Sequence, residues 1–246
     1  YTAPVRVIHN GVRAPIAAAP REIGDSRAPR LGLAGRLIAI KGACLALHAL
    51  AVLRSRGIAA TLSIAGDGPL RETLTAQARA LEIADAVDFL GVVDNMPGFF
   101  RHIDVLLHPA LREPFGMVAA EAQAAGVPVV CNAVDGLPEV VTDGETGLCV
   151  VPRGNLERHA DLGGENAGLP PVVYRPDTDD VAPPRICEPD DLAAAVIELT
   201  ADATRYRRMS AAALAHMQRS FDFDDHVDAV LATAREYADT GRLLEA

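Results

Sequence analysis

The feature that most constrains the fold is an alternation of short apolar runs with segments of helical periodicity between residues 31 and 151. The first apolar run, residues 31–35, suits a buried strand. The segment 41–56 that follows repeats leucine at helical spacing and ends before Gly57, a residue typical of helix ends. Because two parallel strands need a crossover connection, usually a helix, the alternation predicts an α/β fold with a doubly wound parallel sheet.

The same pattern sets the expected domain organisation. Further strands are predicted at residues 61–65, 86–90, 105–108, 127–131 and 148–151. Further helices are predicted at residues 69–82 and 95–102, and another one follows the strand 105–108 and stops at Gly126. Residues 1–30 are expected to hold an N-terminal strand and a linker, and 31–151 the ligand-binding α/β domain. Residues 152–189 are rich in Pro, Asp, Gly and Arg, so we expect a surface loop that could be disordered. Residues 190–246 are predicted to form a tail of three helices that completes the domain.

Composition narrows the class of protein. The net charge of −10 argues against a nucleic-acid-binding surface, which needs clustered Lys and Arg. Four widely spaced cysteines without a CxxC pair suggest small buried side chains in a reducing, cytoplasmic compartment. No apolar run approaches the roughly 20 residues that span a bilayer, and no signal peptide is visible. The chain starts at Tyr1 without Met, so we expect a fragment of a longer protein.

Candidate ligand-binding residues follow successive predicted strands. In parallel sheets, ligands bind outside the carboxyl ends of the strands, where strand order reverses. Candidate residues at these ends are Gly35 and Arg36, residues 66–68, Gly91, Glu113 and residues 136–139. Their convergence at one edge predicts a ligand site there.

The segment 108–129 combines a strand end, a polar turn and a helix of small residues. The start of such a helix presents unpaired N–H groups and the positive end of its dipole, which favours an anion. Glu113 precedes this helix and Glu121 lies within it, about 12 Å apart if the spacing is helical. Two carboxylates at that separation cannot share a proton or a metal. They could hold the two ends of an elongated polyhydroxylated ligand whose phosphates lie between them.

Glu113-Pro-Phe-Gly-Met-Val-Ala-Ala-Glu121 resembles the E-x7-E signature of retaining GT-B glycosyltransferases, the "glycosyl transferases group 1" family that includes glycogen synthases and mannosyltransferases. Other motifs occur in that family's order and spacing: Gly35-Arg36-Leu37 with Lys41-Gly42, Gly66-Asp67-Gly68-Pro69, Phe89-Leu90-Gly91, Gly126-Val-Pro-Val-Val130 and Gly136-Leu-Pro-Glu-Val140. The resemblance is close over residues 30–151. It implies a Rossmann-like half of a GT-B fold, the C-terminal domain that binds the sugar donor.

The resemblance also implies roles for particular residues. Arg36 and Lys41 would contact the donor's diphosphate, and Glu113 would bind or orient the transferred sugar. Glu121 would bind the ribose hydroxyls, and Gly91 marks the nucleobase position. The implied catalytic set is Arg36, Lys41 and Glu113, and the implied donor-binding set is Gly35, Gly91, Phe115, Gly116, Met117, Val118 and Glu121. No metal ligand and no cofactor are expected.

The implied reaction transfers a sugar from a UDP-, GDP- or ADP-linked donor to an acceptor hydroxyl with retention at the anomeric carbon. The acceptor domain would precede this chain, any membrane contact would be peripheral and through that domain, and the chain alone would be inactive. In the family, a short turn usually replaces residues 152–189, and the last helix commonly crosses back onto the N-terminal domain. Alternatives are a phosphorylase-like or nucleotide-sugar epimerase activity, or a non-catalytic donor-binding module that acts with a separate acceptor-binding chain.

Several patterns compete with this interpretation. The run from Gly66 begins like a dinucleotide fingerprint but has Arg71 at the third glycine position. Asp177-Thr-Asp179 and Asp222-Phe-Asp224 spell the D-x-D motif of metal-dependent GT-A enzymes, but Asp222 is predicted to be a helix N-cap. For His108 two interpretations remain: a role near the sugar, or no functional role. His102 is expected to be a helix-end side chain.

Overall fold

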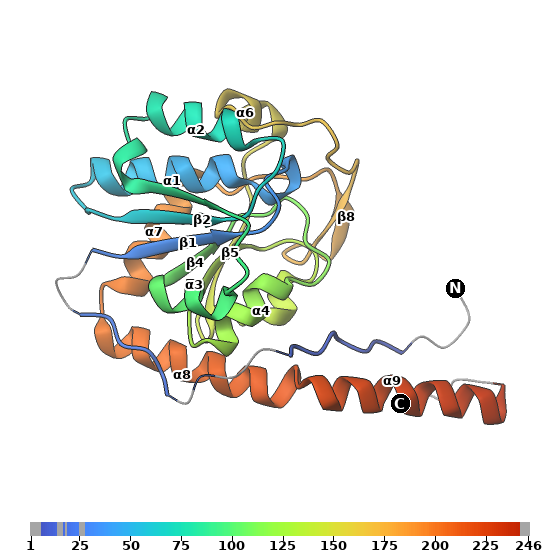
Figure 1. The fold of residues 1–246 in the computed structure, drawn as a ribbon. Coiled ribbons are helices and arrows are strands. Elements are labelled where there is room, and N and C mark those ends of the chain that lie inside the picture. Colours follow the sequence, from blue (N-terminus) through green and yellow to red (C-terminus); the bar gives the residue numbers. More distant parts are fainter. Residues whose placement is uncertain (1–5, 14–16, 18, 25–27, 242–246) are drawn as a thin grey trace.

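The computed structural model describes residues 6–13, 17, 19–24 and 28–241. Its centre is a six-stranded parallel sheet with strand order β3-β2-β1-β4-β5-β6 (Figure 1). The strands are β1 Arg30–Ala34, β2 Thr61–Ala65, β3 Val87–Gly91, β4 Val105–His108, β5 Val129–Asn132 and β6 Gly147–Val150. Strand order reverses between β1 and β4, so the prediction of a doubly wound parallel sheet is confirmed.

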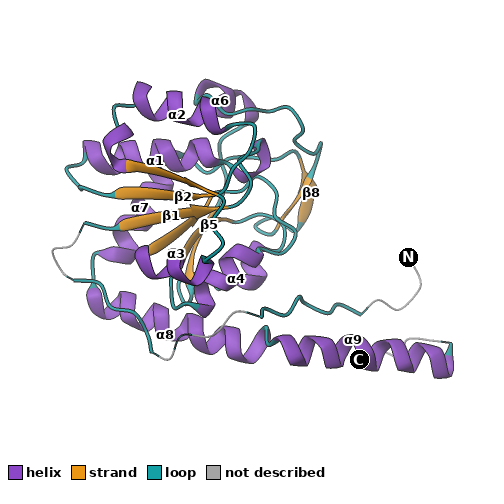
Figure 2. Ribbon diagram, viewed as in Figure 1, coloured by secondary structure: helices purple, strands orange, loops and turns teal. Residues whose placement is uncertain are grey.

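Helices cover both faces of the sheet (Figure 2). One hydrophobic core packs the sheet against α1 Ala43–Ser55, α2 Arg71–Ala80 and α7 Pro189–Thr200. A second core packs the other face against α3 Met96–His102, α4 Met117–Ala124 and α5 Leu137–Val140. Short 3-10 turns, η1 Ala39–Lys41 and η2 Ala84–Ala86, precede α1 and β3. Two buried layers explain why β4 and β5 are apolar up to their last residues, His108 and Asn132: every residue of both strands is buried.

The tail consists of α8 Ala203–Ser220 and α9 Phe223–Thr240. Helix α8 packs against α4, whereas α9 has no buried residue and extends away from the body of the domain (Figure 1). The side chain of Asp222 accepts hydrogen bonds from the backbone N–H groups of Asp224 and Asp225, at 2.9 and 3.1 Å. The predicted N-cap is therefore confirmed.

The N-terminal strand predicted within residues 1–30 does not form in residues 6–11, the described residues ahead of Val12. This segment instead runs extended beside α9 (Figure 1), and the Arg6 guanidinium lies 2.9 Å from the Glu236 carboxylate. The next residues form only one isolated bridge, where Val12 N–H donates to the Phe221 carbonyl at 2.9 Å. The prediction of a strand here is wrong, because the described residues of the segment lie beside α9 and pair with no strand of the sheet. Residues 1–5 lie outside the described part.

Residues 152–189 are also more ordered than expected. They form α6 Leu156–Asp161 and an antiparallel hairpin of β7 Val173–Arg175 with β8 Asp180–Ala182. His159, Ile186 and Cys187 are buried, and the His159 ring lies 3.3 Å from the Cys44 thiol of α1. The prediction of a structureless loop is therefore corrected. Its order comes from single buried side chains spread along the segment, which produce no periodic pattern.

Candidate functional site

The first three strand ends are tied together by glycine-rich turns. Gly35 N–H donates to the Ala65 carbonyl at 2.9 Å, and Gly66 N–H donates to the Gly91 carbonyl at 2.7 Å. A Cβ on Gly66 would lie 1.9 Å from the Gly35 carbonyl oxygen, and Gly66 has a φ of 143°. Only glycine allows these two turns to approach so closely. The turns after β1, β2 and β3 therefore form one continuous rim.

This rim also carries a cluster of three side chains, Lys41, His108 and Glu113. The sequence analysis placed Lys41 and Glu113 in the catalytic set but left His108 open. The Lys41 ammonium lies 2.5 Å from Glu113 Oε2, and His108 Nε2 lies 3.0 Å from the same oxygen. The Glu113 and His108 side chains are only 12% and 3% exposed. His108 thus belongs to the candidate site through Glu113, whose carboxylate it contacts directly.

The environment of Glu113 keeps its carboxyl group ionised. Burial alone would raise its pKa, but hydrogen bonds and charge interactions with His108 and Lys41 outweigh burial and lower the pKa to about 2. A carboxylate accepts hydrogen bonds and cannot donate one. Near neutral pH, Glu113 can therefore orient hydroxyl groups but has no proton to give.

Asp135 supports the Glu113 loop from a position the sequence analysis missed. One of its carboxylate oxygens accepts from Glu113 N–H, and the other accepts from Tyr174 N–H on β7, both at 2.9 Å. Asp135 has a φ of 46°, a left-handed conformation that Asp tolerates better than most residues. Its Asp-Gly dipeptide with Gly136 was the available signal of a turn. The contact joins the inserted hairpin to the candidate site.

Helix α4 begins beside this loop and lacks a side-chain cap. Its N-cap is Gly116, with a φ of 104°, and no side chain accepts a hydrogen bond from the first turn. A Cβ on Gly116 would lie 2.7 Å from the Leu137 side chain, so glycine is also required by packing. The first N–H groups of a helix have no partner within it, so those of Met117 and Val118 are available to an anion.

Arg36 lies at the same rim, next to Lys41. It follows β1, its side chain is exposed, and no partner for its guanidinium is found among the described residues. Lys41 passes close by, since its Cε is 3.8 Å from where a Gly35 Cβ would be. Two cations therefore flank the turn after β1.

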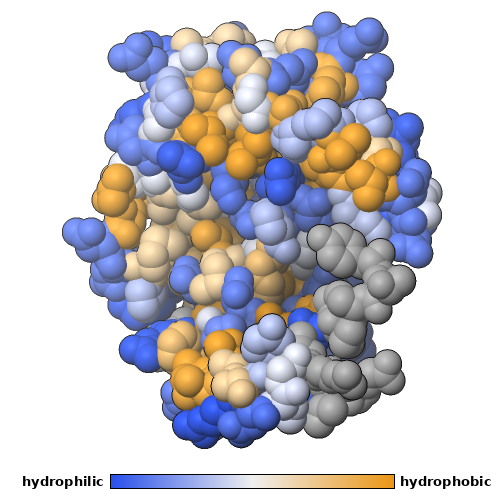
Figure 3. All heavy atoms as spheres, turned by 90° about the vertical axis from the view of Figure 1, so that its right-hand side faces the viewer, coloured by the Kyte–Doolittle hydropathy of each residue, from blue (hydrophilic) through white to orange (hydrophobic). Residues whose placement is uncertain are grey.

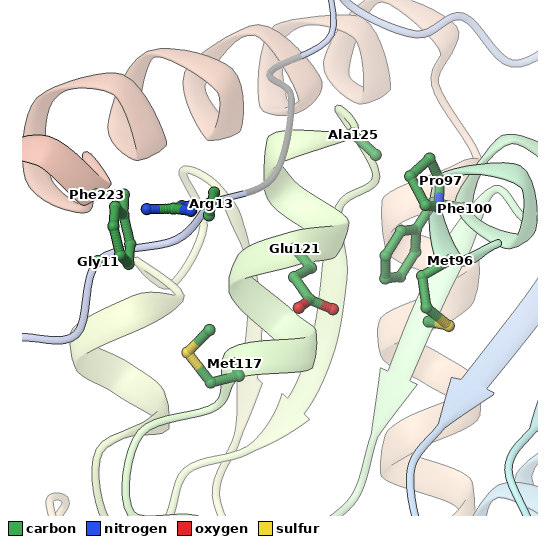
Figure 4. A pocket seen from close by; sticks show the side chains of 9 residues that line it. All are labelled: Gly11, Arg13, Met96, Pro97, Phe100, Met117, Glu121, Ala125 and Phe223. Atoms are coloured by element: carbon green, nitrogen blue, oxygen red, sulfur yellow. The ribbon is translucent and has the colours of Figure 1, made fainter. Parts of the chain in front are cut away.

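Glu121 points into a cavity of about 330 Å³ between α3 and α4. Figure 4 shows its carboxylate directed away from α4 into this space, with Arg13 and Phe223 at one end. The Arg13 guanidinium stacks on the Phe223 ring at 4.1 Å from the centroid. The full lining is Gly11, Arg13, Met96, Pro97, Phe100, Met117, Glu121, Ala125 and Phe223. The sequence missed most of this lining because it comes from four separate segments.

The Glu121 carboxylate has no hydrogen-bond or ion-pair partner among the residues that the structure describes. The residue is partly buried, and burial raises its pKa. A partly buried acid without a partner is unfavourable in the unliganded protein, and such groups concentrate at binding sites. Glu113, which precedes α4, and Glu121, which lies within α4, therefore have opposite electrostatic environments: the pKa of the first is lowered and that of the second is raised.

The turn after β3 has a different character. Gly91 has a φ of 70°, and the Arg71 side chain lies beside it, donating to the Phe89 carbonyl at 3.1 Å. Leu90 and Val92, on either side of Gly91, are exposed. Figure 3 looks onto the carboxyl side of the sheet and shows apolar and polar surface interleaved. This rim therefore offers both apolar contact and backbone polar groups to a ligand.

The remaining candidate motifs do not assemble into a site. Asp177 lies 3.3 Å from Arg175, and Asp179 accepts from the Tyr174 hydroxyl, while Asp222 caps α9. His102 Nδ1 lies 2.8 Å from the Gly98 carbonyl of its own helix. Among the described residues, no three His, Cys, Asp or Glu side chains are grouped so that they could hold a metal ion. In the same part of the chain, no helix is long and apolar enough to cross a membrane.

Comparison with known proteins decides the family. The family model described as "Glycosyl transferases group 1" matches residues 21–162, more than half of the chain. The chain belongs to this family. Over 161 residues it is 38% identical to the glycogen synthase of Mycobacterium tuberculosis (strain ATCC 25618 / H37Rv). This match covers 61% of the present chain and 37% of the glycogen synthase. The chain thus spans little more than a third of this curated relative.

Solved structures have the same fold. Anabaena HepE, solved with UDP and glucose, matches with a TM-score of 0.66 and 22% identity, over 86% of this chain and 49% of HepE. The C-terminal domain of LpcC, a group 1 glycosyl transferase from Francisella tularensis, matches with a TM-score of 0.60 and 17% identity, over 83% of this chain and 95% of that domain. The chain therefore has the fold of the C-terminal, Rossmann-like domain of a GT-B glycosyltransferase.

Proposed function

We propose that this chain is the donor-binding half of a retaining glycosyltransferase that transfers a sugar from a nucleotide diphosphate sugar to an acceptor hydroxyl. The observation that carries the proposal is Glu121, a partly buried carboxylate that has no partner among the described residues and is directed into a cavity beside an uncapped helix start. A ligand that brings hydroxyl groups to Glu121 and phosphate to the helix start satisfies both groups. A nucleoside diphosphate has this arrangement of hydroxyls and phosphates.

The diphosphate would lie between Arg36, Lys41 and the start of α4. Arg36 offers bidentate hydrogen bonds, Lys41 a compact charge and α4 its first N–H groups. In the unliganded domain Lys41 is compensated by Glu113 at 2.5 Å, so the ammonium must bridge Glu113 and the incoming phosphate. Negative charge on the diphosphate grows as the sugar leaves, so these groups stabilise the transition state more than the ground state. We propose that the domain binds the donor without a metal ion.

The sugar would lie at the Glu113 end. Because the pKa of Glu113 is about 2, its carboxylate serves as a hydrogen-bond acceptor for sugar hydroxyls and not as a general acid. Backbone contact with Asp135 fixes the orientation of the loop that carries Glu113. Gly91 and the apolar surface of Leu90 and Val92 would accommodate the nucleobase. HepE, a protein with the same fold, was solved with UDP and glucose, which supports this class of ligand.

The acceptor would be held by a second domain outside this chain. Helix α9 supports this, because none of its residues is buried and Val230, Leu231 and Tyr237 are exposed. Catalysis by proximity requires donor and acceptor in one water-excluded cleft, and the chain contributes only one of the two walls of a GT-B cleft. We expect the isolated chain to bind nucleotide weakly, with a dissociation constant of about 1 μM to 1 mM, and to transfer no sugar. Robust transfer by this chain to any member of an acceptor panel would contradict the half-enzyme proposal.

Calorimetry with UDP, GDP and ADP in the presence of EDTA tests the donor site. One nucleotide should bind, and Arg36→Ala should weaken its binding by about 1.5–3 kcal/mol, the scale of a charged hydrogen bond. Arg56→Ala is the matched control, since it removes the same charge at the C-terminal end of α1, away from the carboxyl ends of the strands, and should leave binding unchanged. A strict requirement for Mg²⁺ or Mn²⁺ would refute the metal-independent clamp. Equal loss in both variants would show that Arg36 acts only through net charge.

A further inference from the structure

One oxygen of the Glu113 carboxylate serves two donors. Its Oε2 lies 2.5 Å from the Lys41 ammonium and 3.0 Å from His108 Nε2, while no partner for Oε1 is found among the described residues. A carboxylate carries one negative charge, and in the unliganded domain Lys41 already compensates it. His108 therefore contacts Glu113 as a second donor, through an Nε2–H group.

The His108 ring is able to take up a proton. Histidine is the side chain whose charge most readily changes between pH 5 and 8. Because Nε2–H donates to Glu113, Nδ1 of the neutral ring holds a lone pair. Among the described residues Nδ1 has no hydrogen-bond partner, yet it is not fully buried. A proton from solution can therefore reach the ring, although the side chain as a whole is only 3% exposed.

Positive groups surround the ring in the unliganded domain. The Lys41 ammonium shares the Glu113 oxygen, Arg36 follows the neighbouring strand β1, and the uncapped start of α4 adds the positive end of its dipole. These groups would repel a second cation on Glu113. A diphosphate bound between Arg36, Lys41 and α4 reverses this balance, because it brings its own negative charge and draws on the charge of Lys41.

The remaining titratable groups near β4 do not compete for this proton. Cys131 stands opposite His108 in the register of β5, and a hydrogen bond between thiols together with burial raises its pKa, so this thiol stays neutral. Asp135 accepts hydrogen bonds from two backbone N–H groups. Glu121 of α4 points into a cavity that His108 does not line. Among the described residues, Glu113 is therefore the acidic group in direct contact with the ring.

We propose that His108 becomes a cationic partner of Glu113 when the donor diphosphate binds, and that it takes up a proton from solution in doing so. The proton adds to Nδ1, and Nε2–H continues to donate to Glu113. The carboxylate thus keeps its charge and its orientation toward the sugar while the Lys41 ammonium is shared with the phosphate. His108 is a positioning residue that acts on the sugar through Glu113. This role rests on the proposed function, because it requires a diphosphate beside Lys41.

Calorimetry in two buffers with different enthalpies of ionisation measures the proton uptake. The ligands are UDP-glucose, GDP-mannose and ADP-glucose, since both phosphates of a nucleotide sugar are substituted and keep a constant charge, whereas the terminal phosphate of a bare nucleotide titrates near pH 6. If binding raises the proton affinity of the ring about tenfold, the nucleotide sugar that binds should take up about half a proton at pH 7. It should also bind about fivefold more tightly at pH 6 than at pH 8.

His108→Gln tests the residue, because glutamine keeps an N–H donor for Glu113 but cannot be protonated. The affinity deficit of this variant relative to wild type should be about fivefold larger at pH 6 than at pH 8, and its proton uptake should disappear. His102→Gln is the matched control, since His102 is exposed on α3 and bonds to a carbonyl of its own helix. It should keep the wild-type uptake.

NMR of the histidine rings in the wild-type protein gives a second measurement that needs no variant. At pH 7, the nucleotide sugar that binds should move one of the seven histidine rings toward its protonated form. Binding without proton uptake, or equal uptake in wild type and His108→Gln, would overturn the role of His108 and leave the donor site intact. Loss of the uptake in His102→Gln would overturn it as well. Absence of binding by all three nucleotide sugars would refute the donor site itself, and this inference with it.

Discussion

Replacing Glu113 with glutamine should destabilise the unliganded domain, because the carboxylate is the partner of both Lys41 and His108. A carboxyl group whose pKa falls from 4.5 to about 2 on folding contributes about 3 kcal/mol of stability at neutral pH. The side chain is only 12% exposed, so solvent screening reduces this little. We therefore expect Glu113→Gln to lower the free energy of unfolding by about 2–3 kcal/mol at pH 7.

The pH dependence has a definite sign. Because the folded-state pKa of Glu113 lies below its unfolded value, its contribution is present above about pH 4.5 and is lost as the pH falls toward 2. At pH 3 the difference between wild type and Glu113→Gln should shrink to about half. Urea unfolding followed by far-ultraviolet circular dichroism measures it, since the chain has no Trp for fluorescence. The other carboxyl groups titrate in both proteins and cancel in the difference.

Glu121→Gln is the matched control, because the expected change in stability has the opposite sign. Burial raises the pKa of Glu121 and no partner compensates its charge among the described residues, so at neutral pH this carboxylate opposes folding. Removing the charge should leave the unliganded domain as stable as wild type or more stable, while removing a ligand contact. A Glu113→Gln deficit that does not change with pH would refute the ion-pair argument. Equal destabilisation by both substitutions would refute the contrast between the two environments.

Three further outcomes are expected. In calorimetry, Glu121→Gln should weaken binding of the bare nucleoside diphosphate and of the nucleotide sugar alike, whereas Glu113→Gln should matter mainly when the sugar is attached; equal losses for the bare nucleotide would refute a ligand held at both ends. Asp135→Ala should lower the free energy of unfolding in urea by about 1–3 kcal/mol, because the backbone N–H groups of Glu113 and Tyr174 lose their acceptors. Asp135→Asn should lower it less, since Asn keeps one acceptor oxygen and tolerates the positive φ. In hydrogen-exchange mass spectrometry, α9 should be the least protected of the long helices, since none of its residues is buried; protection equal to that of α8 would contradict this.

The sequence by itself determined the layered α/β architecture. Strands β2 Thr61–Ala65 and β4 Val105–His108 begin and end at the predicted residues. Apolar runs, helical periodicity and terminal glycines are local signals, so each segment carries its own evidence. Ligands bind at the carboxyl ends of parallel strands, so the order of strands and helices along the chain was enough to place Arg36 and Glu113 at one edge of the sheet, whereas Lys41 was added by the resemblance to the family.

Only the tertiary structure decided how these residues interact. The Lys41–Glu113 contact joins residues 72 positions apart, and the Glu121 cavity is closed by Arg13 and Phe223 from opposite ends of the chain. Which side chains arrive from other segments decides both that Asp135 supports Glu113 and that Glu121 has no partner in the described part of the chain. The same reason explains the missed hairpin: its strands have three residues each, too few for a periodic signal, and their order depends on contacts made elsewhere in the fold.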